Sequence, residues 1–201
     1  MREGSATPRH AGQSGLQLRP CLPRVLRPAP SPVCSPTNSH LLAFGCADSR
    51  AYIYDLRNLS APAGVATGPR RAVSYVRFTS SGRQLVGAST DNALCVWDAG
   101  ALLGDGPTTP VACLGGHLNR RNFVGLAVSQ QGLVACGSED NSVYLYSTDL
   151  PFPLARHCFG GGGGEAGSSS AAFASAVCWA PSGRHCVAAN SQGLLQVLAV
   201  G

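Results

Sequence analysis

Short apolar runs alternate with turns of Gly, Ser, Asn and Asp from about residue 40 to the end of the chain. The clearest unit comprises "AVSYVRF" (72–78), "QLVGAS" (84–89) and "ALCVWD" (93–98), separated by "TSSGR" and "TDN". Short runs rich in β-branched and aromatic residues, bounded by such turns, are typical of antiparallel strands. The unit therefore predicts three strands joined by two tight turns.

This unit recurs along the chain, which indicates an internal repeat. One further copy starts with "NFVGLAV" (122–128), and another starts with "FASAVCWA" (173–180). The stretch "CADSRAYIYD" (46–55) ends an earlier copy. The third strand of each of the four copies carries an anchor residue: Tyr54, Trp97, Tyr146 and Leu198. The anchors follow one another at a period slightly above the ~40–45 residues of a four-stranded propeller blade. A loop insertion at 160–170 lengthens the last interval.

Two dipeptides identify the kind of propeller. Trp97-Asp98 is the WD dipeptide that ends a blade, and Gly116-His117 is the GH dipeptide that precedes the next one. Their order with the strands and the Asp-containing turns is typical of WD40 repeats. The sequence therefore predicts an all-β fold, a partial WD40 β-propeller of about four blades.

Each blade is expected to contain a structural network of buried polar groups. Asp48, Asp91 and Asp140 each precede the anchor of their blade by six residues, and we expect each to accept a hydrogen bond from the His that opens the blade, with the anchor completing the network. His117, Asp140 and Tyr146 form the complete set. Asp91 and Trp97 have Pro69 where their His belongs.

The chain divides into two parts. Residues 1–39 are rich in Pro and Arg and lack a hydrophobic period, so they predict a disordered segment. An organellar transit peptide or a spurious extension of the gene product would have a similar composition. Residues 40–201 form the predicted WD40 repeat region.

Composition excludes several classes of function. All 15 basic residues are Arg, and the absence of Lys excludes a Walker phosphate loop and a Schiff-base enzyme. Nine scattered Cys without metal-ligand spacing indicate reduced thiols and no metal site. The repeat region is nearly neutral and contains no long apolar run, which argues against nucleic-acid and membrane partners. We expect neither a cofactor nor catalytic activity.

The amino-acid sequence between the repeat dipeptides resembles that of one protein family. "YDLRN" (54–58), "ASTD" (88–91), "NFVGL" (122–126) and "AANSQG" (188–193) are among seven phrases that resemble the C-terminal propeller of the constitutive-photomorphogenesis E3 ubiquitin ligases and their SPA partners. The resemblance runs from about Leu42 to Val200. In that family the propeller has seven blades and recognises acidic peptides with a Val-Pro motif, presented by transcription factors and photoreceptors. It implies a non-catalytic substrate-recognition role in ubiquitination, in the nucleus or cytoplasm.

The resemblance also implies a peptide-binding site. Phe123 matches an aromatic of the Val-Pro pocket, and Arg71 stands where the family has a lysine that faces the acidic part of the peptide. Ser49 replaces a histidine of the groove. Arg120 replaces a glutamate and reverses its charge, which is expected to alter peptide preference.

A second, weaker site is a short box for docking on a cullin-RING ligase adaptor. Tyr54, Asp55 and Arg57 match its aromatic–Asp–x–Arg pattern. The same pattern would arise if Arg57 simply paired with Asp55. Two alternatives to a ligase function stay open: a generic WD40 scaffold, and a truncated, non-functional isoform or fragment with exposed sheet edges.

Overall fold

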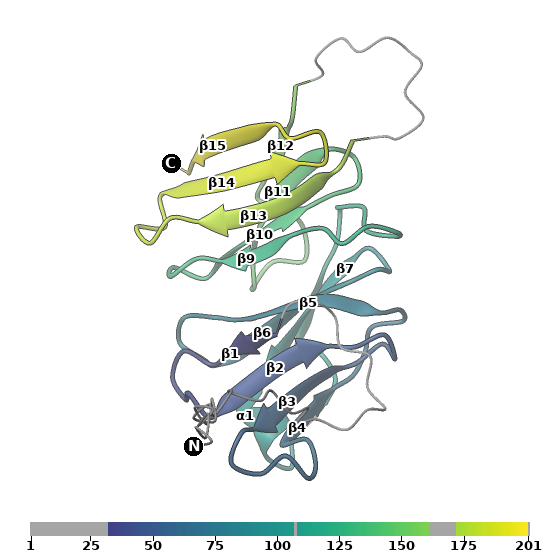
Figure 1. Cartoon of the computed structure of the whole chain (residues 1–201), viewed down its shortest axis with the longest axis vertical. Coiled ribbons are helices and arrows are strands. Elements are labelled where there is room, and N and C mark those ends of the chain that lie inside the picture. Colours follow the sequence, from purple (N-terminus) through teal and green to yellow (C-terminus); the bar gives the residue numbers. More distant parts are fainter. Residues whose placement is uncertain (1–31, 107, 161–171, 201) are drawn as a thin grey trace, which may run out of the picture.

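The computed structural model describes residues 32–106, 108–160 and 172–200. Within these residues almost all regular structure is β, arranged in four antiparallel sheets (Figure 1). The first sheet contains β1 (Val33–Cys34), β2 (Leu41–Gly45), β3 (Ala51–Asp55) and β4 (Gly64–Ala66). The second contains β5 (Val73–Phe78), β6 (Gln84–Ser89), β7 (Ala93–Asp98) and β8 (Ala112–Leu114).

The second half of the chain repeats this arrangement. The third sheet contains β9 (Leu126–Val128), β10 (Leu133–Gly137), β11 (Ser142–Ser147) and β12 (Ala155–Cys158). The fourth contains β13 (Ala174–Trp179), β14 (His185–Asn190) and β15 (Leu195–Ala199). Within every sheet, strands that follow one another in the chain pair with each other.

The sheets pack in chain order through their first strands. Strand β5 contacts β1 and β2, β9 contacts β5, and β13 contacts β9 and β10. Figure 1 shows the sheets following one another from the N-terminal to the C-terminal end of the molecule. Sheets of three or four antiparallel strands stacked side by side in sequence order are successive propeller blades. The predicted all-β partial propeller is confirmed.

The repeat region begins earlier than the sequence predicts. Strand β1 lies within the segment 1–39 that we assigned to the disordered part, because Val33 pairs with Ala43 and Cys34 pairs with Leu42. A two-residue strand carries too little hydrophobic pattern to be recognised from sequence. Residues 1–31 and most of the 160–170 insertion lie outside the described residues.

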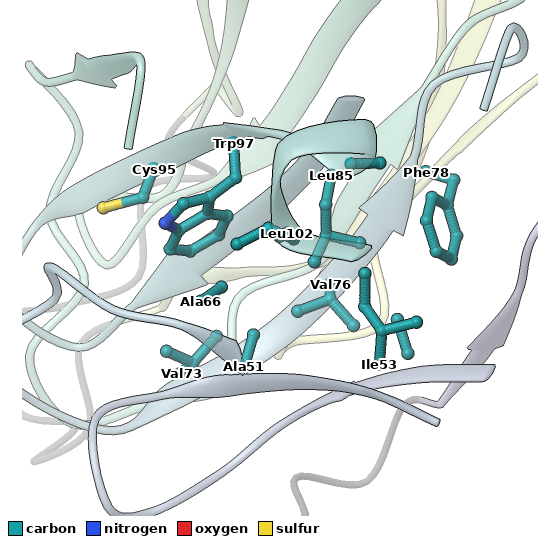
Figure 2. Packing of buried hydrophobic residues seen from close by; sticks show 12 residues of the cluster. Ala51, Ile53, Ala66, Val73, Val76, Phe78, Leu85, Cys95, Trp97 and Leu102 are labelled. Atoms are coloured by element: carbon teal, nitrogen blue, oxygen red, sulfur yellow. The ribbon is translucent and has the colours of Figure 1, made fainter. Parts of the chain in front are cut away.

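Hydrophobic clusters fill the spaces between neighbouring blades. The largest side chain of the first cluster is Trp97, which is fully buried, and Ile53, Val76 and Leu85 belong to the same cluster (Figure 2). A second cluster joins the second and third blades around Leu94, Leu126 and Tyr146. Burial of such side chains contributes about 1.5–3 kcal/mol each. These clusters therefore hold the order of the blades.

Glycine at the end of the second strand allows one blade to approach the next. A Cβ added to Gly45 would lie 2.3 Å from the carbonyl oxygen of Val73, and one added to Gly137 would lie 2.3 Å from that of Ala174. Ala88 holds the corresponding position of the second blade. The contacts from the first to the second blade and from the third to the fourth therefore require glycine.

One short helix, α1 (Ala99–Leu103), follows β7. The Asp98 carboxylate caps it by accepting a hydrogen bond from the Ala101 amide at 2.8 Å. The repeat pattern does not predict this helix, because the WD dipeptide normally leads into a turn. Across the part of the chain that the structure describes, no helix has the length and apolarity needed to span a membrane.

Candidate functional site

Two kinds of loop meet at one end of the four blades. The turns between second and third strands lie at this end. The last residue of each outer strand, Ala66 in β4 and Leu114 in β8, pairs with Ala51 or Leu94 at the start of the third strand. The loop from the outer strand to the next blade therefore leaves from the same end. We call this end the turn face. It comprises residues 46–50, 67–72, 90–92, 115–125, 138–141 and 191–194.

Each turn between second and third strands contains one residue in the left-handed backbone region. Ser49, Asn92 and Asn141 have φ values of 71°, 69° and 58°, and Gly193 has a φ of 83°. Asn and Gly adopt this conformation readily, whereas Ser does so at some cost in free energy. Ser49, which we predicted to contact peptide, lies on the turn face, but its position is set by this backbone requirement.

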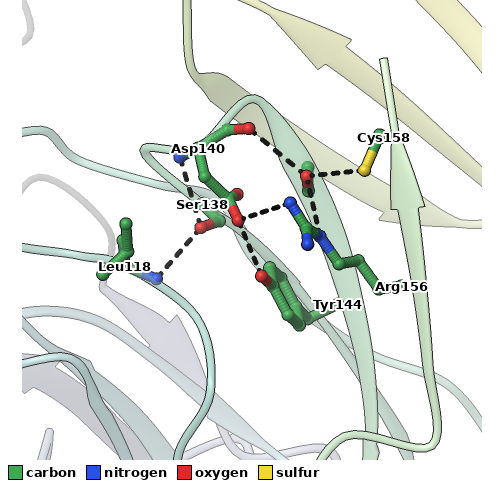
Figure 3. Close-up of polar contacts among 7 residues, drawn as sticks. Leu118, Ser138, Asp140, Tyr144, Arg156 and Cys158 are labelled. Atoms are coloured by element: carbon green, nitrogen blue, oxygen red, sulfur yellow. Dashed lines mark hydrogen bonds and ion pairs between the residues drawn. The ribbon is translucent and has the colours of Figure 1, made fainter. Parts of the chain in front are cut away.

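The Asp before each left-handed residue is bound differently from our prediction. Asp140 accepts a hydrogen bond from the Tyr144 hydroxyl at 2.7 Å and pairs with Arg156 at 3.0 Å (Figure 3). In the first blade Asp48 accepts from the Tyr52 hydroxyl at 2.5 Å. In these two blades the donor to the Asp is therefore the tyrosine four positions after it, and not the His that we expected to open the blade. Residues i and i+4 meet because the tight turn folds the third strand back beside the Asp.

The buried His117 binds the anchor of its blade. Its Nδ1 lies 3.0 Å from the Tyr146 hydroxyl, and His117 is 2% exposed. Its Nε2 and the Oδ1 of Asp140 are both buried and have no hydrogen-bond partner among the described residues, so the predicted His–Asp bond is absent. Burial lowers the pKa of His117 to about 4, although the charges of Asp140 and Asp91 act in the opposite direction. The imidazole is therefore neutral at pH 7.

The second blade replaces its missing His with backbone contacts. The indole Nε1 of Trp97 donates to the Thr67 carbonyl oxygen at 2.8 Å. The Asp91 carboxylate accepts from the Arg70 amide at 2.7 Å. Asp91 and Trp97 therefore both bind the loop 67–72, but they do not bind each other. These contacts support a structural role for both side chains.

Glu139 organises the loop of residues 115–125 on the turn face. Its Oε1 accepts hydrogen bonds from the amides of Arg120, Arg121 and Asn122 at 2.9, 2.5 and 2.7 Å. Burial alone would raise the pKa of Glu139, but these three hydrogen bonds outweigh it and the pKa is lowered. Asn119 ties the same loop to the turn 90–92 through the side-chain amide oxygen of Asn92 at 2.8 Å. The loop is thus held by the blades on both sides of it.

This loop presents an apolar and basic surface to solvent. Phe123 is 53% exposed although it is a large aromatic residue, and Arg120 and Arg121 are exposed beside it in sequence. Arg70 and Arg71 are exposed on the neighbouring loop 67–72, where Arg71 makes only a long contact, 3.5 Å, to the Thr90 carbonyl oxygen.

The arginines of the turn face form no ion pair with a carboxylate of the described residues, although the charge of Arg121 helps to lower the pKa of Glu139. Within residues 32–106, 108–160 and 172–200, ion pairs form only between Arg57 and Asp55 and between Arg156 and Asp140. The carboxylates of the turn face are occupied elsewhere: Glu139 binds backbone amides, and Asp140 binds Arg156 and Tyr144. The chemistry of this face therefore suits an acidic ligand with an apolar group.

The predicted adaptor-docking residues lie at the opposite end of the first blade. Tyr54 is 3% exposed and packs against Phe44, so its ring is part of the core, and docking on an adaptor stays a prediction. Arg57 pairs with Asp55 at 2.6 Å, which lowers the pKa of Asp55 to about 2. The alternative in which the two residues simply pair with each other is confirmed.

Sequence reasoning missed two groups of residues. It did not predict that the tyrosines at positions 52 and 144 bind the turn Asp, because the repeat pattern singles out only the anchors two residues later. It also did not single out Glu139 or Arg121. The only sequence signal for Glu139 is its place directly before the turn Asp, where the second blade has Thr90 and the first has Ala47.

Comparison with known proteins agrees with the fold. The WD domain, G-beta repeat, family matches residues 62–98. Protein SUPPRESSOR OF PHYA-105 1 of Arabidopsis thaliana is 42% identical over 85% of this chain and 17% of its own length. E3 ubiquitin-protein ligase COP1 of the same plant is 43% identical over 82% of this chain and 23% of its own length. WD repeat-containing protein RUP2, also from Arabidopsis thaliana, is 41% identical over 86% of this chain and 48% of its own length.

The chain thus spans less than half the length of each of these relatives. Its similarity to them covers most of the described residues, and Protein SPA1-RELATED 3 of Arabidopsis thaliana adds a further match at 39% identity over 78% of the chain. A repeat family matches one blade, and the structure shows the same strand arrangement in its neighbours. The chain therefore belongs to the WD40 repeat family and is similar, over most of its length, to COP1 and SPA proteins.

Proposed function

We propose that the chain is a protein-interaction module whose turn face binds acidic peptides containing a Val-Pro motif. One observation carries this proposal: four exposed arginines that form no ion pair with any described carboxylate stand on the two loops that flank the turn 90–92, together with the exposed Phe123. A guanidinium can bind a carboxylate through two hydrogen bonds, and a flat aromatic ring suits the apolar face of a proline. In a WD40 propeller such exposed loops are the usual interaction surface.

The similarity to E3 ubiquitin-protein ligase COP1 supports a place for this module in ubiquitination and photomorphogenesis. There it would hold an acidic substrate, such as a transcription factor or photoreceptor, near a catalytic subunit, since holding two groups together raises their effective concentration. SPA-type proteins and a cullin-RING adaptor are further candidate partners. This role places the chain in the nucleus or cytoplasm, which fluorescence imaging of the tagged protein would test.

The test is direct titration of the purified chain with fluorescent peptides. We expect a peptide with several acidic residues followed by Val-Pro to bind, and its version with Ala-Ala to bind more weakly. Arg71→Glu places a negative charge against the acidic segment, so it should weaken binding about tenfold, equivalent to about 1.4 kcal/mol. Phe123→Ala should remove the preference for Val-Pro over Ala-Ala.

A matched control is Arg83→Glu, which makes the same charge change on an exposed residue at the other end of the second blade. This variant should bind like the parent. Added salt should weaken binding to the parent chain, because exposed charges are screened. If Arg71→Glu and Phe123→Ala both bind with the parent affinity, the turn face is not the peptide site. If no acidic peptide binds, a generic WD40 scaffold is the better description.

A further inference from the structure

Cys95 and Cys113 stand directly opposite each other on β7 and β8 of the second blade. Opposed residues of antiparallel strands have Cα atoms about 4.5–5.5 Å apart. This spacing falls within the range of about 4.4–6.8 Å that a disulfide requires. The two thiols also lie close enough for a hydrogen bond between them. The pair therefore meets the distance requirement without movement of the backbone.

The strand pairing of the third blade indicates which kind of antiparallel pair the two cysteines form. The Phe159 amide donates a hydrogen bond to the Asn141 carbonyl oxygen at 3.0 Å, so these two opposed residues form a hydrogen-bonded pair. Hydrogen-bonded and non-hydrogen-bonded pairs alternate along antiparallel strands. The Tyr144–Arg156 pair, three positions further along, is therefore a non-hydrogen-bonded pair. That pair occupies the same place in the third blade as the cysteine pair does in the second. Side chains of non-hydrogen-bonded pairs approach most closely. This is a favourable place for a cross-strand bond.

The two sulfur atoms differ in access. Cys113 is exposed, whereas Cys95 is 2% exposed and belongs to the same cluster as Trp97 (Figure 2). Burial raises the pKa of the Cys95 thiol, and the adjacent Cys113 raises it further. A soluble oxidant would therefore reach Cys113 first, and Cys95 would be held beside the product.

We propose that Cys95 and Cys113 form a reversible disulfide site that peroxides close and thiol reductants open. In the first step the Cys113 thiolate attacks one oxygen of hydrogen peroxide and the O–O bond breaks. The other oxygen leaves as hydroxide, which takes a proton to become water, and Cys113 becomes a sulfenic acid.

In the second step the Cys95 sulfur attacks the Cys113 sulfur, the S–S bond forms and the S–O bond breaks. The leaving hydroxide takes the Cys95 proton and departs as the second water. Two thiols thus lose two electrons and two protons, and one peroxide is reduced to two waters. The fixed register of β7 and β8 supplies the proximity that offsets the low reactivity of the buried thiol.

The bond would fasten the outer strand of the second blade. Strand β8 ends at Leu114, and the loop that carries Phe123 begins directly after it. A disulfide one residue before this end would limit opening of β8 from β7 and hold the start of the loop in place. This consequence does not depend on what the turn face binds.

In the test, the reduced full chain is treated with hydrogen peroxide, unfolded in denaturant so that iodoacetamide can block every remaining thiol, and digested with trypsin. Arg83 and Arg120 bound a peptide that contains both cysteines of the pair and no other. We expect this peptide to lose two hydrogen masses and to carry no alkyl group. Treatment with dithiothreitol before blocking should restore two alkyl groups.

Two controls make the result specific. Cys113→Ser changes an exposed side chain, and it should leave Cys95 fully alkylated after peroxide treatment. Cys158 is also exposed but stands opposite Ser142, so it should form no disulfide within its sheet. The proposal is overturned if the peptide keeps two alkyl groups under conditions that oxidise Cys158, if Cys113 proceeds to a sulfinic acid, or if it links to another cysteine.

Discussion

Replacing Glu139 should release the loop that presents the candidate peptide site. Three backbone amides donate to its Oε1, and hydrogen bonds to a charged acceptor each contribute about 1.5–3 kcal/mol when buried. Glu139 is only half-buried, so water takes over part of each bond and screens the charge. We expect Glu139→Ala to lower the free energy of unfolding by about 1–3 kcal/mol in total. Glu139→Gln keeps an acceptor oxygen and should cost about half as much.

Hydrogen exchange of individual amides is the most direct measurement. The amides of Arg120, Arg121 and Asn122 should exchange faster in Glu139→Ala, while those of β10 keep their protection because their sheet partners are unchanged. Urea unfolding of the same variants gives the free-energy difference. Asp105→Asn removes an exposed carboxylate at the opposite end of the second blade, and it should change neither observable.

The charge of Glu139 also predicts a dependence on pH. Its pKa is lower in the folded chain than the value of about 4.3 expected when unfolded. Its contribution to stability is therefore complete above pH 4.3 and is lost as the pH falls through the lower, folded value. Unchanged exchange of the three loop amides in Glu139→Ala would refute the view that this carboxylate holds the loop.

Three further predictions concern the blades. His117 has a folded pKa of about 4, below its unfolded value of about 6.5, so stability should fall by about 2 kcal/mol from pH 7 to pH 5, and chemical unfolding of His117→Asn should show a shallower pH profile. Gly137→Ala should lower the melting temperature because its Cβ would meet the Ala174 carbonyl oxygen, whereas Gly115→Ala, with open space around it, should not. Tyr144→Phe leaves its carboxylate acceptor with one partner fewer and should cost about 1–2 kcal/mol in urea unfolding; an unchanged midpoint would contradict the structural role of this bond.

The hydrophobic pattern was sufficient to predict the blades, because strands of an antiparallel sheet carry their own local signal. Alternating apolar positions bounded by turn residues placed the first three strands of the second to fourth blades, and the WD and GH dipeptides identified the repeat. The outer strands β8 and β12, the two-residue β1 and the helix α1 escaped prediction. Strand β1 exists only through its pairing with β2, and α1 depends on the Asp98 cap and on burial of Leu102 beside the first blade.

The polar partners could not be read from spacing alone. Asp140 and Tyr146 recur at a constant interval, yet the hydrogen bond goes to Tyr144, since the turn and the strand pleat decide which hydroxyl faces the carboxylate. The same limit applies to Tyr54, because the aromatic–Asp–x–Arg pattern does not show that its ring lies in the core.

The sequence by itself therefore determined the fold class and the number of repeats, because the strands follow from a local alternation and the blades from the recurrence of one short unit. The tertiary structure decided which groups meet. Glu139 holds amides nearly twenty residues away along the chain, and Cys95 stands opposite Cys113 across two strands. Such contacts depend on sheet register and blade packing, which join positions that no local pattern relates.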